Sequence, residues 1–198
     1  IIRLTCDKEI GIYATGASHK IIDNNGLIEI GDSLDINAPS IGIYSETSGD
    51  TFTNNGTVTS GKNSIGMYNH GDAVIQNGIL NVGDTGVGAY VTDGNITNTP
   101  AAQFNFTSTN GIGVYALNSH VSNSALMDIG NSNYGFILMD SSFANMAANI
   151  NLGTDSVFVY RSGAGNIINN LGTAITMSGS DNIAYYTING GSITNDGD

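Results

Sequence analysis

The chain has 198 residues, of which 27 are glycine, 2 are proline and 11% are charged. Its 17 Asp and Glu outnumber 5 Lys and Arg, and the resulting net charge of −12 argues against nucleic-acid binding, which needs basic surfaces. So few charges exclude a helical bundle with a surface of ion pairs, and an apolar share of 40% is too high for a disordered chain.

The two ends and the single cysteine bear on how the chain is organised. Cys6 is the only cysteine, so an internal disulfide is impossible. The first residues lack a signal-peptide pattern, and no stretch approaches the roughly 18 apolar residues of a membrane span. Because the last residues stop inside a repeat, we expect residues 1–198 to be one segment excised from a longer chain.

The first recurring unit is an apolar residue, a glycine, a second apolar residue and a tyrosine. Clear copies occupy residues 10–13, 41–44, 65–68, 87–90 and 112–115, and degenerate copies occupy 134–137, 157–160 and 183–186. Tyr13 and Tyr186 are seven repeats apart, so one repeat averages about 25 residues. A period of this length indicates a stack of coils rather than a propeller or a helical array.

Two further units complete each repeat. The second is an apolar residue followed two positions later by an amide, and these amides are Asn24, Asn54, Gln76, Asn98, Asn123, Asn145, Asn170 and Asn195. The third alternates apolar residues, as in Ile28 and Ile30 or Leu80 and Val82. Stacked Asn side chains can hydrogen-bond from coil to coil, so we predict a structural ladder of amides at one corner.

Three short runs of period two per repeat, separated by Gly, Asn and Ser, predict three strands and three turns. We therefore predict an all-β, right-handed parallel β-helix (β-solenoid) of about eight coils, with 22–25 residues and three strands per coil. Strand alternation places Ile65 and Met67 in the core, and Gly66 and Tyr68 outside.

The tyrosines of the first unit are the first candidate site. On the outside of the solenoid they would form an aromatic stripe, and its best-defined members are Tyr44, Tyr68, Tyr90 and Tyr115. Exposed aromatic rings in a line can stack on sugars or anchor a protein partner. The alternative is that the stacked rings only stabilise neighbouring coils.

Irregular loops are the second candidate site, because insertions in a solenoid map to loops that often share a binding face. Extra residues lie at 32–40, 45–50, 99–103 and 161–166, and the candidate contact residues there are Asp32, Asp35, Asn37, Glu46 and Arg161. Asp32, Asp35 and Asn37 lack the spacing of a calcium loop. His19, His70 and His120 lie at different positions within their repeats, so they would not stack as a set of metal ligands. We expect no metal and no cofactor.

The carboxylates of the predicted strands are scattered and no nucleophile motif is present, so we expect no catalysis. A polysaccharide-active enzyme remains an alternative, because parallel β-helices include such enzymes.

The repeats resemble the passenger domains of large type V (type Va) autotransporters, and are most similar to giant adhesins of the fusobacterial type. Residues 21–32, IIDNNGLIEIGD, carry the resemblance. It implies a β-helix secreted through a C-terminal outer-membrane barrel and displayed on the cell surface. It also implies adhesion to host proteins, to glycans or to other bacteria. We expect a monomer, and a stalk without a binding site of its own is the alternative.

Overall fold

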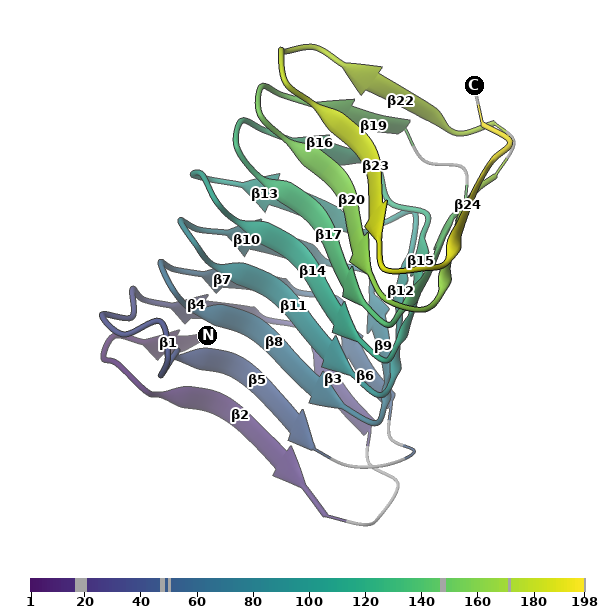
Figure 1. Ribbon diagram of the computed structural model, residues 1–198. Coiled ribbons are helices and arrows are strands. Elements are labelled where there is room, and N and C mark those ends of the chain that lie inside the picture. Colours follow the sequence, from purple (N-terminus) through teal and green to yellow (C-terminus); the bar gives the residue numbers. More distant parts are fainter. Residues whose placement is uncertain (17–20, 47–48, 50, 147–148, 171, 198) are drawn as a thin grey trace.

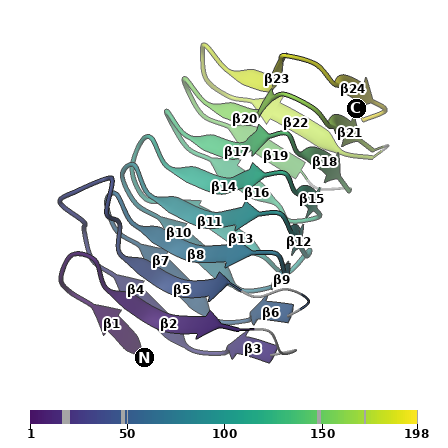
Figure 2. The ribbon, with the colours of Figure 1, turned by 60° about the horizontal axis from the view of Figure 1, so that its bottom comes forward.

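The computed structural model describes residues 1–16, 21–46, 49, 51–146, 149–170 and 172–197. The chain is an all-β solenoid in which each coil contributes one strand to each of three parallel sheets (Figure 1). Figure 2 shows the coils stacked in sequence order from the N-terminal to the C-terminal end. The predicted β-solenoid is confirmed, and the described residues contain no helix long and apolar enough to cross a membrane.

Each sheet has eight strands. Sheet A consists of β1 (Ile2–Leu4), β4 (Leu27–Ile30), β7 (Thr57–Ser60), β10 (Ile79–Val82), β13 (Gln103–Phe106), β16 (Met127–Ile129), β19 (Asn149–Leu152) and β22 (Ala174–Met177). Sheet B consists of β2 (Ile10–Thr15), β5 (Ile41–Glu46), β8 (Ile65–His70), β11 (Val87–Thr92), β14 (Ile112–Leu117), β17 (Tyr134–Met139), β20 (Val157–Ser162) and β23 (Ile183–Ile188). Sheet C consists of β3 (Ile21–Asn24), β6 (Thr51–Asn54), β9 (Ala73–Gln76), β12 (Asn95–Asn98), β15 (His120–Asn123), β18 (Ser142–Asn145), β21 (Asn166–Asn169) and β24 (Ser192–Asn195).

Neighbouring coils pair in register, so equivalent residues of successive repeats lie side by side. Tyr44 pairs with Tyr68, and Tyr68 pairs with Tyr90, at spacings of 24 and 22 residues. The first coil is longer, because Tyr13 pairs with Tyr44 at a spacing of 31 residues. Most of this excess is the loop between β4 and β5, which contains the predicted insertion at 32–40.

The core is a set of apolar columns that run along the solenoid axis. Ile43, Met67 and Val114 face inward from sheet B and are at most 1% exposed. In the C-terminal half the columns contain aromatic side chains, and the ring centroids of Phe136 and Phe143 lie 4.7 Å apart. Burial of these columns is the main favourable contribution to folding.

The alternation of inward-facing and outward-facing residues fails at one position of the sheet B strands. Gly66 is buried, and a Cβ on it would lie 2.5 Å from the carbonyl oxygen of Gly88 and 3.2 Å from Val58 Cγ1. Gly66 and Met67 therefore both face inward, where the strand curves around the core (Figure 1). The predicted core position of Ile65 is wrong: it is half-buried, and the glycine takes the inward position because no side chain fits there.

The predicted amide ladder is present at the end of the sheet C strands. Asn24 Nδ2 donates to Asn54 Oδ1 at 2.7 Å, and Asn54 Nδ2 donates to Gln76 Oε1 at 2.8 Å. A second series of bonds joins Asn98, Asn123, Asn145, Asn169 and Asn195. Almost all of these side chains are buried, so the bonds satisfy amides that would otherwise destabilise the fold.

One predicted member of the ladder is wrong. Asn169, rather than Asn170, pairs with Asn145 in the register of β18 and β21. The sequence Ile167-Ile168-Asn169-Asn170 offers two apolar-x-Asn frames, and the buried Ile167 selects the earlier frame. Asn170 lies just outside, with its Nδ2 2.8 Å from the sulfur of Met146.

The ladder is interrupted between Gln76 and Asn98. Gln76 Nε2 donates to the carbonyl oxygen of Gly78 at 2.8 Å, and the buried Asn98 Oδ1 has no hydrogen-bond partner among the described residues. Asn123 shows that the shorter side chain satisfies both groups, because its Nδ2 donates to Ala125 O at 3.2 Å and to Asn145 Oδ1 at 3.1 Å. The extra methylene of Gln76 therefore accounts for the interruption.

We expect Gln76→Asn to raise the free energy of unfolding by roughly 1 kcal/mol, because Asn98 Oδ1 gains a donor. Urea unfolding followed by circular dichroism measures the change. The matched variant Asn123→Gln introduces a second interruption and should lower stability by a similar amount. Equal destabilisation by both variants would contradict this account of the ladder.

Gly66→Ala should destabilise the chain by about 1–3 kcal/mol, because its methyl group would overlap the backbone of the next coil. Gly26→Ala is the matched control, since the nearest atom to a Cβ there is Asn24 Oδ1 at 3.9 Å. Thermal unfolding of the two variants compares them directly. Equal losses in the two variants would show that steric exclusion at Gly66 is not the cause.

Candidate functional site

The tyrosines of sheet B form a stacked column on the outside of the solenoid, as predicted. The rings of Tyr13, Tyr44, Tyr68, Tyr90 and Tyr115 follow one another with centroid distances of 5.1, 4.8, 5.4 and 4.7 Å. The register places Ile137 next, and a second stack of Tyr160 on Tyr186 follows at 5.3 Å.

This geometry limits what the tyrosine column can bind. Each inner ring has both faces against neighbouring rings at interplanar angles of 9–23°, so only edges and hydroxyl groups remain accessible. A sugar stacks on the face of an aromatic ring, and those faces are already covered. The structure therefore favours a coil-stabilising role for Tyr44, Tyr68, Tyr90 and Tyr115.

Glu46, at the end of β5, lies beside the tyrosine column. The Tyr44 hydroxyl donates a hydrogen bond to Glu46 Oε2 at 2.7 Å. This bond, together with partial burial, raises the pKa of Tyr44 to about 12. Partial burial also raises the pKa of Tyr68 and of Tyr115.

The acidic residues of the first long loop bond to the backbone instead of converging on a ligand. Asp32 Oδ1 accepts a hydrogen bond from the amide of Lys62 in the next coil at 2.8 Å. Asp35 Oδ1 accepts from the amide of Asn37 at 2.9 Å. Asp32 therefore links coils, and Asp35 and Asn37 close an exposed turn.

The histidines are likewise separate. His19 lies outside the described residues. His70 Nε2 lies 3.3 Å from Asp93 Oδ2, and His120 Nδ1 lies 2.7 Å from Ser142 Oγ. Among the residues that the structure describes, no three His, Cys, Asp or Glu side chains are grouped so that they could hold a metal ion.

The remaining predicted loops are short in the structure. The turn at 99–103 is closed by a bond from Ala102 N to Thr99 O at 3.0 Å, directly before β13. The loop at 45–50 is described only in part, because residues 47, 48 and 50 lie outside the described ranges.

The expected surface position of Arg161 is wrong. It lies in β20, and its side chain is completely buried. The guanidinium donates to the carbonyl oxygens of Gly163 at 2.6 Å and Gly165 at 2.9 Å. It also bonds to Gly190 O and Thr187 Oγ1 of the following coil. Arg161 therefore joins two turns from inside the solenoid, and burial lowers its pKa.

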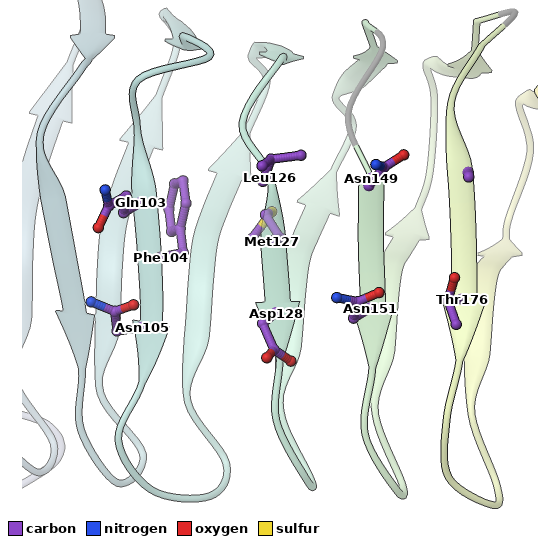
Figure 3. Close-up of a pocket in the computed structure, with 10 residues that line it drawn as sticks. Gln103, Phe104, Asn105, Leu126, Met127, Asp128, Asn149, Asn151 and Thr176 are labelled. Carbon is purple, nitrogen blue, oxygen red and sulfur yellow. The ribbon is translucent and has the colours of Figure 1, made fainter.

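A groove that the sequence analysis did not identify lies on the outer face of sheet A (Figure 3). It has a volume of about 510 Å³, within the range of small-molecule sites. It crosses β13, β16, β19 and β22, and its lining residues are Gln103, Phe104, Asn105, Leu126, Met127, Asp128, Asn149, Asn151, Ala174 and Thr176. Figure 3 shows a row of polar side chains, Asn105, Asp128, Asn151 and Thr176, on successive coils.

This row continues a polar column that starts at the N-terminal end of sheet A. The register aligns Arg3, Glu29, Thr59, Asn81, Asn105, Asp128, Asn151 and Thr176. We call these residues the outer polar column. They occupy the outward positions between the apolar residues of the third repeat unit, so the period-two pattern was the signal that could have located them.

The first members of the outer polar column are paired with one another. Arg3 forms an ion pair with Glu29. Asn81 Nδ2 donates to Thr59 Oγ1 at 2.9 Å, and Asn105 Nδ2 donates to Asn81 Oδ1 at 2.9 Å. These contacts tie the coils together in the same way as the buried ladder.

Asp128 interrupts this series because a carboxylate has no hydrogen to donate to Asn105. Beyond it, none of the side chains of Asp128, Asn151 and Thr176 has a hydrogen-bond partner within the described ranges of the chain. Gln103 and Asn149, which line the same groove, likewise have none among those residues. The groove therefore gathers polar groups that are free to bind a ligand.

The comparisons with known proteins add no relatives: no protein-family model, no curated protein and no solved structure matches the chain.

Replacing Glu46 with Ala should lower the pKa of Tyr44 from about 12 toward its ordinary value near 10. In the native chain the Tyr44 proton is held more tightly than in the unfolded chain. The stabilising contribution is therefore complete below pH 10 and is lost as the pH rises through about 12. NMR titration of ring-labelled tyrosine, with Tyr44→Phe for assignment, measures the shift. Glu29→Ala on sheet A should leave it unchanged.

Proposed function

We propose that this chain is a non-catalytic segment of a bacterial surface adhesin of the autotransporter type, which attaches its cell to host surfaces or to other bacteria. The observation that carries the proposal is the groove on sheet A, where five polar side chains without partners among the described residues face solvent on a rigid stack of coils. The strands fix the backbone positions of these groups, so the spacing between them is set before a ligand binds.

The composition of the groove supports binding rather than bond cleavage. Its lining contains amides, a hydroxyl group, apolar side chains and one carboxylate, Asp128. Hydrolysis of a glycosidic bond generally uses a pair of carboxyl groups about 5–10 Å apart. The proposed role is therefore recognition of a surface.

The shape of the chain also suits an adhesin. In a solenoid each coil contacts only its neighbours, so the fold extends along one axis and exposes a long lateral surface. The net charge of −12 keeps such an extended surface soluble outside the cell. We propose that the segment is displayed beyond the outer membrane, held by a barrel elsewhere in a longer protein, and acts as a monomer.

Beads coated with the purified chain should attach to epithelial cells or to bacterial cells several-fold more than beads coated with albumin. Flow cytometry or microscopy counts the attached beads. Heat-unfolded chain on the same beads is the control, because it presents the same charge without the groove. If the folded chain attaches to neither cell type, the adhesin proposal is overturned and a stalk without its own binding site is favoured.

A further inference from the structure

We propose that the groove on the outer face of sheet A binds a linear, uncharged glycan, laid along the solenoid axis across β13, β16, β19 and β22. This inference rests on the adhesive function proposed above, and it adds the site and the chemical class of the ligand. The tyrosine column is not the glycan site in this proposal, because its ring faces are covered by neighbouring rings. The glycan instead contacts amides, a carboxylate and an exposed aliphatic side chain in the groove.

The hydrogen-bonding groups of the groove match sugar hydroxyls. Gln103, Asn149 and Asn151 each offer both a donor and an acceptor through one amide. A sugar hydroxyl is also both donor and acceptor, so either orientation of each amide finds a partner. In Figure 3 Gln103 projects from β13, and Asn149 and Asn151 project from β19 two coils further on, so one extended ligand can meet all three.

The charge of the groove selects an uncharged polymer. Among the described residues that line it, Asp128 is the only charged one, and it lies in the outer polar column between Asn105 and Asn151. Its carboxylate forms charge-assisted hydrogen bonds with hydroxyl groups but repels uronic acids and sulfate esters. Because no Lys or Arg lines the groove, an anionic glycan would find no compensating charge there.

An apolar surface beside the polar row supplies the remaining contact. The Leu126 side chain is 62% exposed, and Ala174 lines the groove two coils further on. Figure 3 shows Leu126 in line with Gln103 and Asn149, parallel to the row that contains Asp128. The non-polar face of a sugar ring can pack on such an aliphatic patch while its hydroxyls bond to the polar groups.

The spacing of the strands sets the length of the ligand. Neighbouring strands lie about 4.8 Å apart, so the four strands of the groove span roughly 14 Å, and the two rows are about 7 Å apart. This footprint is long and narrow, which suits several consecutive units of an unbranched chain.

The test uses neutral hexasaccharides of glucose and of N-acetylglucosamine, with polygalacturonate and heparin as anionic comparators. All are immobilised at high density, because multivalent display makes weak sites measurable. We expect the chain to bind at least one neutral glycan and neither anionic polymer. Asp128→Ala and Asn151→Ala should each weaken binding about tenfold, the loss expected for a hydrogen bond to a charged or polar group.

Thr59→Ala is the matched control, because Thr59 occupies the outer polar column on β7, outside the groove. It should bind as the native chain does. Thermal midpoints of Asp128→Ala and Asn151→Ala equal to that of the native chain establish that their losses are local. The inference is overturned if no neutral glycan binds, if an anionic glycan binds more strongly, or if Asp128→Ala and Asn151→Ala bind like Thr59→Ala.

The bead assay separates this inference from the adhesin proposal. If coated beads attach to cells, and the two groove variants attach equally well, adhesion stands and the glycan site is wrong. If a neutral glycan binds in the groove but no beads attach to cells, the site stands and the adhesin proposal is wrong.

Discussion

The structure depends on one constraint: each residue lies about 4.8 Å from its counterpart in the next coil, so it must be compatible with a near-copy of itself. Tyr44 stacks on Tyr68, and Asn24 donates to Asn54, because both residue types interact favourably with their own kind. A carboxylate cannot stack in this way, since like charges repel at that distance. This accounts for a chain with abundant Asn, Ser, Thr and Gly and few charges.

The same constraint explains where the irregular features arise. The side chains of a column hydrogen-bond to one another only while the same residue type recurs in each coil. A single change of residue leaves the neighbouring side chain without its hydrogen-bond partner. Gln76 in place of Asn leaves the buried Asn98 Oδ1 without a partner among the described residues. Asp128 likewise leaves Asn105 Oδ1 without a donor from the next coil, on the outside, where this amide faces solvent. A break inside the solenoid therefore lowers stability, whereas a break outside creates a potential binding surface.

The fold could be predicted from sequence because equivalent positions of successive repeats pair with one another, so the length of each repeat gives the register of the strands. The spacing of Tyr44, Tyr68 and Tyr90 gave the pairing of the sheet B strands directly. Ile65 and Asn170 were misplaced because local alternation does not show where a strand curves or which of two frames is buried. Gly66 reveals the curve only once the next coil's backbone is seen to approach it.

The candidate site was harder to predict, for a different reason. Arg161 looked like an exposed loop residue, since no sequence pattern showed that four oxygen atoms of two successive coils surround its guanidinium. The groove depends on which outward side chains lack partners. Whether a side chain has a partner depends on the residue at the same position of the neighbouring coil. The groove could therefore not be predicted from Asp128 considered as one isolated carboxylate.

The interrupted amide ladder also has a mechanical consequence. In this fold the hydrogen bonds between strands run along the solenoid axis, so the pull on the ends that the proposed adhesive role would impose stretches them directly. Between Gln76 and Asn98 the sheets continue without the side-chain bond that reinforces the other coil junctions at this corner. Under tension this junction would therefore carry the load with one side-chain bond fewer at this corner than the junctions on either side of it.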